Sequence, residues 1–290
     1  MENRIAFIIN PISGAKDKTK LPKLIEQIAQ KLGASIEIRY TECSGHAAEL
    51  TRELCSEGFN RIVAVGGDGT INEVAKVLVG TNVELGIVPQ GSGNGLARHL
   101  RIPMTPRKSI EIAISHRSEA IDTAYINQTA FFCTAGVGFD ALIGNRFAES
   151  KSRGLKTYAT IATKEFLSYK PKKYKLDIDG ENVECKAFLI TIANASQYGN
   201  NAYIAPQADL QDGILDVVIV NKLPLLLGPL FAMRLFLKKI ERSRFVKCYR
   251  GRNITIVREG RDYIHYDGEP GTMDSKLELS ITPRSLRVVF

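Results

Sequence analysis

Two glycine-rich runs hold the residues of this 290-residue chain whose types and spacing point most clearly to chemistry. They are Val63-Ala64-Val65-Gly66-Gly67-Asp68-Gly69-Thr70 and Pro89-Gln90-Gly91-Ser92-Gly93-Asn94, and each joins a short β-branched segment to a helical pattern. Glycine lacks a Cβ and adopts positive φ, so backbone N–H groups in such turns approach an anion closely. The helix that follows adds orphan N–H donors and partial positive charge. The runs therefore predict a phosphate-binding site.

Asp68 is out of place in a turn that suits phosphate, unless its carboxylate binds a metal ion or takes a proton. The alternative is a plain strand–turn–helix in which Asp68 caps the helix. The second run favours the chemical interpretation, because its Ser92 and Asn94 supply neutral partners for phosphate or ribose. Neither run is a Walker loop or a three-glycine dinucleotide fingerprint.

A second pair of carboxylates, Asp267 and Glu269, lies at the end of a predicted strand that begins at Tyr263 and ends at Gly268. A base for an attacking hydroxyl group is one role for them. A hairpin turn at Asp267-Gly268 is the better interpretation of these residues alone.

The elements around these motifs change character along the chain. Up to about residue 122 strands and helices alternate, which indicates a parallel sheet with right-handed crossovers. We predict strands over 4–9, 35–40, 61–65 and 84–88, and helices over 18–32, 45–57, 70–79, 94–100 and 106–115. After Ile121, longer alternating strands joined by Asp-Gly turns indicate an antiparallel sandwich. We expect two domains, residues 1–122 and 123–290.

The composition is that of a globular protein with an anionic partner. The net charge is +8, and the five cysteines are scattered without metal-ligand spacing, so we expect reduced thiols and a cytoplasmic protein. Met1-Glu2-Asn3-Arg4 leads directly into a strand, so we expect no signal peptide. No apolar run is long enough to span a bilayer.

The order of motifs resembles the diacylglycerol kinase catalytic family, which includes bacterial lipid kinases and sphingosine kinases. Asn10-Pro11, Gly66–Thr70, Pro89–Asn94 and Asp267-Gly268-Glu269 occur in the family's order and span most of the chain. The resemblance implies an α/β domain like that of NAD kinases and phosphofructokinases, then a β-sandwich domain. It also implies an active site in the interdomain cleft and a tail that can return, over a short stretch, to the first domain.

The family's mechanism implies ATP, Mg²⁺ and a group that orients or deprotonates the attacking hydroxyl. We assign Asp267 as base with Glu269 supporting it, and Asp68 to Mg²⁺–ATP; the swapped assignment stays open. The resemblance reverses the hairpin preference at Asp267-Gly268. The positions matching nucleotide contacts are Asn10, Thr41, Gly66, Gly67, Asp68, Gly69, Thr70, Gly91, Ser92, Gly93 and Asn94. For Thr41, a cap on the helix 45–57 is nearly as good an interpretation.

Two further sites follow from the resemblance. Asp140 matches a carboxylate that sphingosine kinases place near the lipid head group, with a helix N-cap as an equal alternative. Asp212, with the carbonyls of Asp209 and Ile214, matches a structural Mg²⁺ site of bacterial lipid kinases, with an Asp-Gly turn as the alternative. His46 and His265 are interpreted as structural histidines.

Two basic segments bear on partners. Residues 146–175 hold nine Lys and Arg against two Glu, and residues 234–252 hold eight against one. The second follows the apolar run 223–233, an arrangement typical of peripheral contact with an anionic membrane. An amphipathic helix packed on the sandwich explains it equally well. Nucleic acid is not expected, because no binding module is recognised. Whether the chain forms a homodimer stays open.

The sequence thus predicts an ATP-dependent lipid kinase that acts on diacylglycerol. Its alternatives are a sphingoid-base kinase, an NAD-kinase-like enzyme with a soluble substrate, and a non-catalytic nucleotide-binding regulator.

Overall fold

The computed structural model describes residues 4–14, 19–150 and 155–290. It divides into two compact units, the first made of Met1–Thr123 with Pro283–Phe290 and the second of Ala124–Thr282. The boundary expected at residues 122 and 123 falls one residue before this division. Within the described ranges, none of the helices has the length and apolar character needed to cross a membrane.

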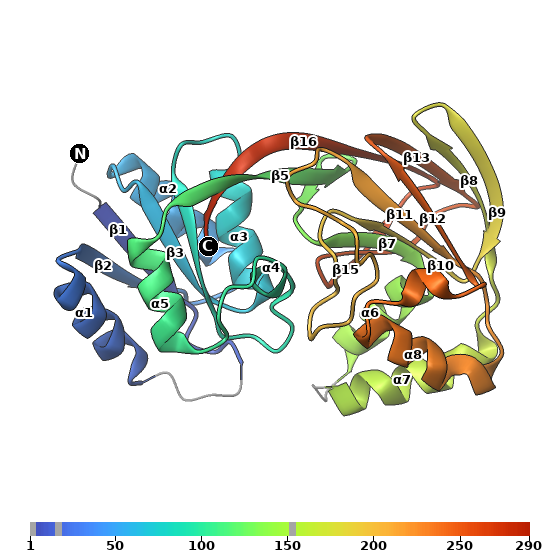
Figure 1. Ribbon diagram of the computed structural model, residues 1–290, viewed down its shortest axis with the longest axis horizontal. Helices are drawn as coiled ribbons and strands as arrows, with labels where there is room; N and C mark the ends of the chain where they lie inside the picture. The colour runs from blue at the N-terminus through green and yellow to red at the C-terminus, as the bar shows by residue number, and fades with distance from the viewer. Residues whose placement is uncertain (1–3, 15–18, 151–154) are drawn as a thin grey trace. The chain divides into compact units, whose positions relative to one another are not determined.

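The first unit is a parallel sheet with helices on both faces (Figure 1). Its strands, in spatial order, are β2 (Ser35–Tyr40), β1 (Arg4–Ile9), β3 (Arg61–Gly66) and β4 (Glu84–Pro89). Its helices are α1 (Leu21–Leu32), α2 (His46–Ser56), α3 (Asp68–Leu78), α4 (Gly95–His99) and α5 (Pro106–Ser115). Helix α1 packs with α5 and α2 with α3, and β3 is buried along its whole length, as a strand covered on both faces must be.

The strand order places a topological switch in this sheet. The chain leaves β1 to form β2 on one side, and then returns past β1 to form β3 on the other side. Ligands of open α/β sheets bind outside the carboxyl ends of the strands at such a point. The sheet alone therefore marks the residues that follow β1 and β3 as a candidate binding site.

The last residues of the sequence complete the first unit. In β16 (Lys276–Val289), Val288 pairs with Leu85 of β4 in the parallel sense. The Arg284 N–H donates to the buried Asp122 carboxylate (2.7 Å), and Gly80 N–H donates to the Ser285 carbonyl (2.7 Å). These contacts hold residues 283–290 in the first unit.

The second unit is an antiparallel β-sandwich. One sheet has the order β16-β13-β8-β9 with β5 and β6 beside it, where β5 and β16 also run into the first unit; the other sheet has the order β12-β11-β10-β7-β14-β15. The strands are β5 (Ser118–Ile126), β6 (Thr129–Phe131), β7 (Thr134–Gly138), β8 (Lys172–Ile178), β9 (Glu181–Ala187), β10 (Leu189–Ala193), β11 (Leu215–Val220), β12 (Val246–Gly251), β13 (Asn253–Arg258), β14 (Asp262–Tyr266) and β15 (Glu269–Met273). One buried cluster takes residues from both sheets, such as Leu176, Ile190 and Ile254, so their facing sides form the core.

Helices cover the outer face of the second sheet. They are α6 (Phe139–Glu149), α7 (Leu155–Ser168) and α8 (Gly228–Phe236), with short 3₁₀ turns η1 (Leu225–Leu227) and η2 (Ile240–Arg242). Of these, α8 confirms that the apolar run 223–233 forms a helix packed on the sandwich, and α6 begins beside Asp140. Phe139 of α6 stacks on Phe188, and Phe166 of α7 meets both rings edge-on. This aromatic cluster explains why α7 forms despite its many Thr residues, since packing overrides weak propensity.

Candidate functional site

The two glycine turns of the first unit touch backbone to backbone. A Cβ on Gly91 would lie 2.6 Å from Gly67 Cα, and a Cβ on Gly93 would lie 2.8 Å from Asp68 Oδ2. Both distances are shorter than any real Cβ contact, so the turns meet only because these residues are glycines. The loops after β3 and β4 thus form one continuous surface beside the switch point.

Asp68 joins the two turns through its carboxylate. Oδ2 accepts the Asn94 N–H (2.8 Å) and Oδ1 accepts the Gly95 N–H (2.8 Å), so Asp68 caps α4 across the loops rather than its own helix α3. Burial raises the pKa of Asp68, while these backbone N–H groups and the charge of Arg98 oppose the rise. The carboxylate is therefore a brace between the turns, whatever else it does.

The other predicted nucleotide residues of the first unit gather around this brace. The Asn10 amide donates to Thr70 Oγ1 (3.0 Å), which ties the end of β1 to the start of α3 across the switch point. The Asn94 side chain closes the second turn, because its Oδ1 accepts the Gly91 N–H and its Nδ2 donates to the Gly91 carbonyl. Ser92, at the tip of this turn, is exposed. The exposed positions, Gly69 and Ser92, are the ones open to a ligand.

Thr41 follows β2 and is buried, with its N–H donating to the Ile9 carbonyl (3.0 Å). It does not cap α2. The N-cap residue there is Gly45, and the carboxylate of Glu73 in α3 accepts the N–H groups of Gly45 (2.9 Å) and Ala47 (3.1 Å). Thr41 was the alternative cap because the actual partner, Glu73, lies 26 to 28 residues away in the sequence, beyond the reach of local patterns.

Sequence reasoning missed Arg98 beside the loops. Its Nε donates to the Gly93 carbonyl (3.0 Å), so a permanent positive charge lies against the second glycine turn. Its place in the helix that follows that turn is the signal that could have identified it. The first unit therefore offers glycine-rich backbone, a helix start and a cation, the usual partners of a phosphate group.

In the second unit, Asp267 and Gly268 form the hairpin turn between β14 and β15. Their φ angles of +49° and +81° are the positive values that a two-residue hairpin requires. The Asp267 carboxylate also accepts three backbone N–H groups, from Phe132 (2.7 Å), Cys133 (2.7 Å) and Thr134 (3.0 Å). The turn interpretation and the site interpretation are thus compatible, because the turn holds a carboxylate in one fixed orientation.

A buried arginine anchors that hairpin. Arg258 of β13 donates to the carbonyls of Tyr263 (2.8 Å), Asp262 (2.8 Å) and Met273 (2.7 Å). Glu269 begins β15 opposite Tyr266, and it is partly exposed. Burial raises the pKa of Tyr266, and the neighbouring charge of Glu269 adds to the rise.

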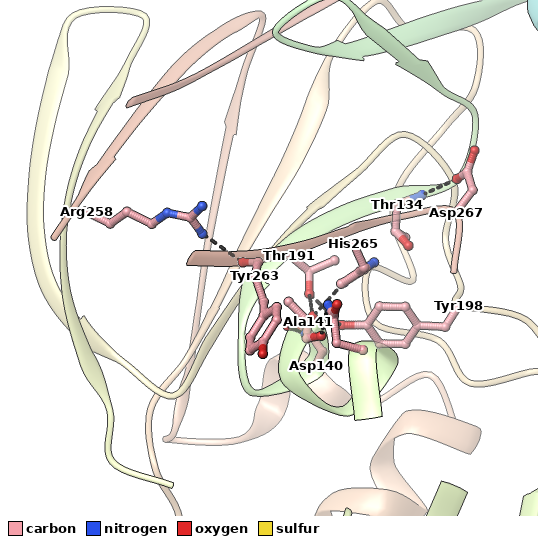
Figure 2. A network of polar contacts seen from close by, with 10 residues as sticks. Thr134, Asp140, Ala141, Thr191, Tyr198, Arg258, Tyr263, His265 and Asp267 are labelled. Atoms are coloured by element: carbon pink, nitrogen blue, oxygen red, sulfur yellow. Dashed lines mark hydrogen bonds and ion pairs between the residues drawn. The ribbon is translucent and has the colours of Figure 1, made fainter. Parts of the chain in front are cut away.

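Asp140 lies at the centre of a buried polar network (Figure 2). Its Oδ1 accepts the Ala141 N–H (2.8 Å), and Oδ2 lies 2.9 Å from His265 Nε2, 3.2 Å from Tyr198 Oη and 3.3 Å from Thr191 Oγ1. The N-cap of α6 is Gly138, so the cap role proposed for Asp140 is wrong. Its side chain holds residues of β10, β14 and the loop after β10 together.

His265 is the functional candidate that the sequence reasoning set aside. A Cβ on Gly136, its partner on β7, would lie 2.6 Å from His265 Nε2 and 2.9 Å from Asp140 Oδ2. Only glycine at this position leaves room for the pair. The 125 residues between Asp140 and His265 leave no local signal, but a histidine two residues before Asp267 was the available hint.

The predicted metal residues lie elsewhere in the second unit. The Asp212 carboxylate makes an ion pair with Arg250, and its Oδ1 accepts the Ile214 N–H (3.0 Å). Across residues 4–14, 19–150 and 155–290, no three His, Cys, Asp or Glu side chains gather as a metal would need. A site of one carboxylate and two backbone carbonyls is not such a group, so the Mg²⁺ site at Asp212, Asp209 and Ile214 stays a prediction, and Mg²⁺ there would share the Asp212 carboxylate with Arg250.

Arg250 also contacts Asp216 (3.4 Å), whose Oδ2 is buried without a hydrogen-bond partner among the described residues. Burial raises the pKa of Asp216 to about 6. The folded protein then binds more protons than the unfolded chain between about pH 4 and pH 6, so this group lowers stability as the pH rises through that window.

We expect Asp216→Asn to stabilise the protein by about 1–2 kcal/mol at pH 7.5 and by much less at pH 4.

Urea unfolding at both pH values checks this, with Asp209→Asn as an exposed control near the same loop. An equal gain at the two pH values would contradict the assigned cause.

Comparison with known proteins agrees with this geometry. Residues 4–126 match the family model for the diacylglycerol kinase catalytic domain, and residues 133–290 match that for the YegS C-terminal NAD kinase beta sandwich-like domain. A probable lipid kinase YegS-like of Chromohalobacter salexigens is 30% identical over 211 residues, 70% of this chain and 68% of the relative. A diacylglycerol kinase of Bacillus subtilis is 30% identical over 226 residues, 76% and 74% of the two chains. The crystal structure of a putative diacylglycerol kinase from Bacillus anthracis matches 99% of this chain and 97% of its own, with a TM-score of 0.80 and 21% identity.

Proposed function

This chain belongs to the diacylglycerol kinase catalytic family, and from that premise we propose that it transfers the γ-phosphate of ATP to a hydroxyl group of a membrane lipid, with diacylglycerol as the preferred acceptor. The observation that carries the proposal is the contact of two glycine turns beside the switch point of the first unit. Backbone N–H groups there, with Arg98 beside them, suit the phosphates of a nucleotide.

In the proposed reaction the acceptor oxygen bonds to the γ-phosphorus as the bond from that phosphorus to the β-phosphate oxygen breaks, so ADP leaves. The hydroxyl proton passes to a carboxylate, which we assign as Asp267. Its three backbone N–H partners fix the orientation that a base or a hydroxyl-positioning group needs. Asp68 remains the alternative base, since burial raises its pKa.

Asp68 would hold Mg²⁺ at the glycine turns when ATP is bound, and the metal would supply positive charge that neutralises the phosphates. Asp68 is the described carboxylate nearest the glycine turns, and its oxygens already accept two backbone N–H groups. It suits a site where phosphate and water supply most of the ligands, as is common for Mg²⁺.

The Asp140 network favours diacylglycerol over a sphingoid base. A sphingoid base carries an ammonium group, which would need acceptor positions on a carboxylate. The carboxylate of Asp140 already accepts the Ala141 N–H and lies against His265 and a hydroxyl pair, Thr191 and Tyr198, that also bond to each other. We therefore assign this network to positioning the strand that carries Asp267, with His265 as a positioning residue.

Transfer of labelled γ-phosphate to lipids in mixed micelles tests the proposal. The panel holds diacylglycerol, monoacylglycerol, sphingosine and ceramide, with NAD as the soluble acceptor. We expect label in diacylglycerol. Label in sphingosine would move the assignment to a sphingoid-base kinase, and label in NAD would move it to a soluble substrate. ATP binding without transfer to any acceptor would support a regulatory protein.

A further inference from the structure

The outward surface of η1 and α8 is apolar. The chain exposes six large apolar side chains there: Leu225, Leu226, Leu230, Met233, Phe236 and Leu237. Leu226 is 92% exposed, and positions 226, 230, 233 and 237 repeat at the spacing of one helix face. Phe231 and Leu235, on the opposite face, pack against the buried cluster that covers the second sheet and includes Phe188 and Val218. The helix is thus apolar on two faces, and the protein covers only one of them.

Positive charges border this apolar stripe. Within and just after α8 the chain places Arg234, Lys238, Lys239, Arg242 and Arg244, against the single acid Glu241. Among the described residues, no ion pair involves any of these five cations. Lys238 instead lies over the ring of Tyr203, 4.4 Å from its centre. The surface therefore combines uncovered apolar groups with uncompensated positive charge.

We propose that this surface, residues 225–244, docks on an anionic lipid bilayer. Apolar side chains on the outward face would enter the boundary between head groups and acyl chains, while the cations meet anionic head groups. The exposed apolar side chains match the acyl layer of a bilayer, and the cations match the negatively charged head groups that lie directly above that layer.

A second copy of this chain fits the same surface poorly. A two-fold dimer uses the same patch on both subunits, so ten cations and only two acids, the two copies of Glu241, would share one interface. Like charges placed together at an interface cost several kcal/mol. Charge complementarity therefore favours the lipid surface over self-association.

Docking deepens the proposed function, because it would bring the enzyme to a substrate that does not leave the membrane. The binding step itself needs neither ATP nor transfer, so it can be measured separately.

Sedimentation with vesicles, in the absence of ATP, tests the proposal. We expect the protein to bind vesicles of phosphatidylcholine with phosphatidylglycerol more tightly than vesicles of phosphatidylcholine alone. Raising the salt from 0.1 to 1 M shortens the screening length from about 10 to about 3 Å and should release it. Lys239→Glu with Arg242→Glu should lower the partition coefficient at least tenfold, since each cation near such a surface contributes about fivefold.

Leu226→Glu with Met233→Glu should lower binding at least tenfold, while the control Val257→Glu should leave it unchanged. Val257 is also an exposed apolar residue, but it lies on β13 in the other sheet. Circular dichroism confirms that the variants fold. The proposal would be overturned if the wild-type protein does not bind the vesicles, or if Val257→Glu lowers binding as much as the paired substitutions. It would also be overturned if the protein is a dimer that Leu226→Glu with Met233→Glu dissociates.

The two proposals fail separately. If docking is right, Leu226→Glu with Met233→Glu loses activity on diacylglycerol embedded in vesicles and keeps its activity on a short-chain diacylglycerol in solution. If the proposed reaction is wrong, vesicle binding persists while no lipid is labelled.

Discussion

Asp267→Asn is expected to lower kcat for phosphate transfer by a factor of about 10³ or more, in line with the loss of a positioned base together with its orientation. The amide nitrogen replaces either Oδ2, which accepts the Phe132 N–H, or Oδ1, which accepts the N–H groups of Cys133 and Thr134. Two donors then face each other, so the hairpin loses both its proton acceptor and part of its anchor. Single-turnover transfer to the preferred lipid, with ATP binding measured in parallel, checks this expectation.

The matched control for Asp267 is Asp179→Asn. Asp179 also sits at positive φ in an Asp-Gly hairpin turn of the second unit and accepts two backbone N–H groups, from Arg252 (2.8 Å) and Asn253 (2.9 Å). These bonds hold the pKa of Asp179 below its ordinary value, so its loss reports the structural cost of removing such a carboxylate. If both variants keep full transfer, Asp267 is a turn residue only, and Asp68→Asn becomes the test of the base.

Gly91→Ala is expected to weaken ATP binding by at least 100-fold while the second unit stays folded. The new Cβ would lie 2.6 Å from Gly67 Cα and 2.9 Å from Asn94 Oδ1. Backbone cannot yield as a flexible side chain can, so the two glycine turns must separate and the bonds of Asp68 to the second turn stretch. Titration calorimetry with ATP and Mg²⁺ measures the loss.

Gly144→Ala serves as the control for that substitution. Gly144 lies inside α6, and an added Cβ there meets nothing within 4 Å. Alanine in a helix interior should be neutral or stabilising by up to about 1 kcal/mol, with ATP binding unchanged. Wild-type affinity in Gly91→Ala would show that the contact of the two turns is not part of the nucleotide site.

The first unit was predictable because its signals are local. Glycine and proline mark the ends of two buried strands, at Gly66 and Pro89, and the four expected strands agree with the structure within a residue. The fold class, a parallel α/β unit followed by a β-sandwich, is confirmed, as is the family resemblance. Helix α3 begins at Asp68, two residues earlier than predicted, because glycine at N2 was taken as part of the turn.

Partners that meet across the fold were not predictable. Asp68 reaches Asn94, Glu73 reaches Gly45, and His265 reaches Asp140, over 26, 28 and 125 residues respectively. Helix and strand periodicities relate residues only a few positions apart, so they do not predict such pairs. Local reasoning could therefore single out polar residues such as Asp68 and Asp140, but it could not find the partners that they contact. The basic segment 146–175 falls partly outside the described residues, at 151–154.

The return of residues 283–290 to the first unit bears on how the protein is synthesised. Asp122 receives its partner, the Arg284 N–H, 162 residues later in the chain. At ribosomal rates of about 5–20 residues per second, the first unit waits roughly ten to thirty seconds for this strand. Throughout that interval the edge of β4 that pairs with Val288 has no neighbour, which invites pairing with other nascent chains. We infer that the unit made first is completed last, and that molecular chaperones matter most for it during translation.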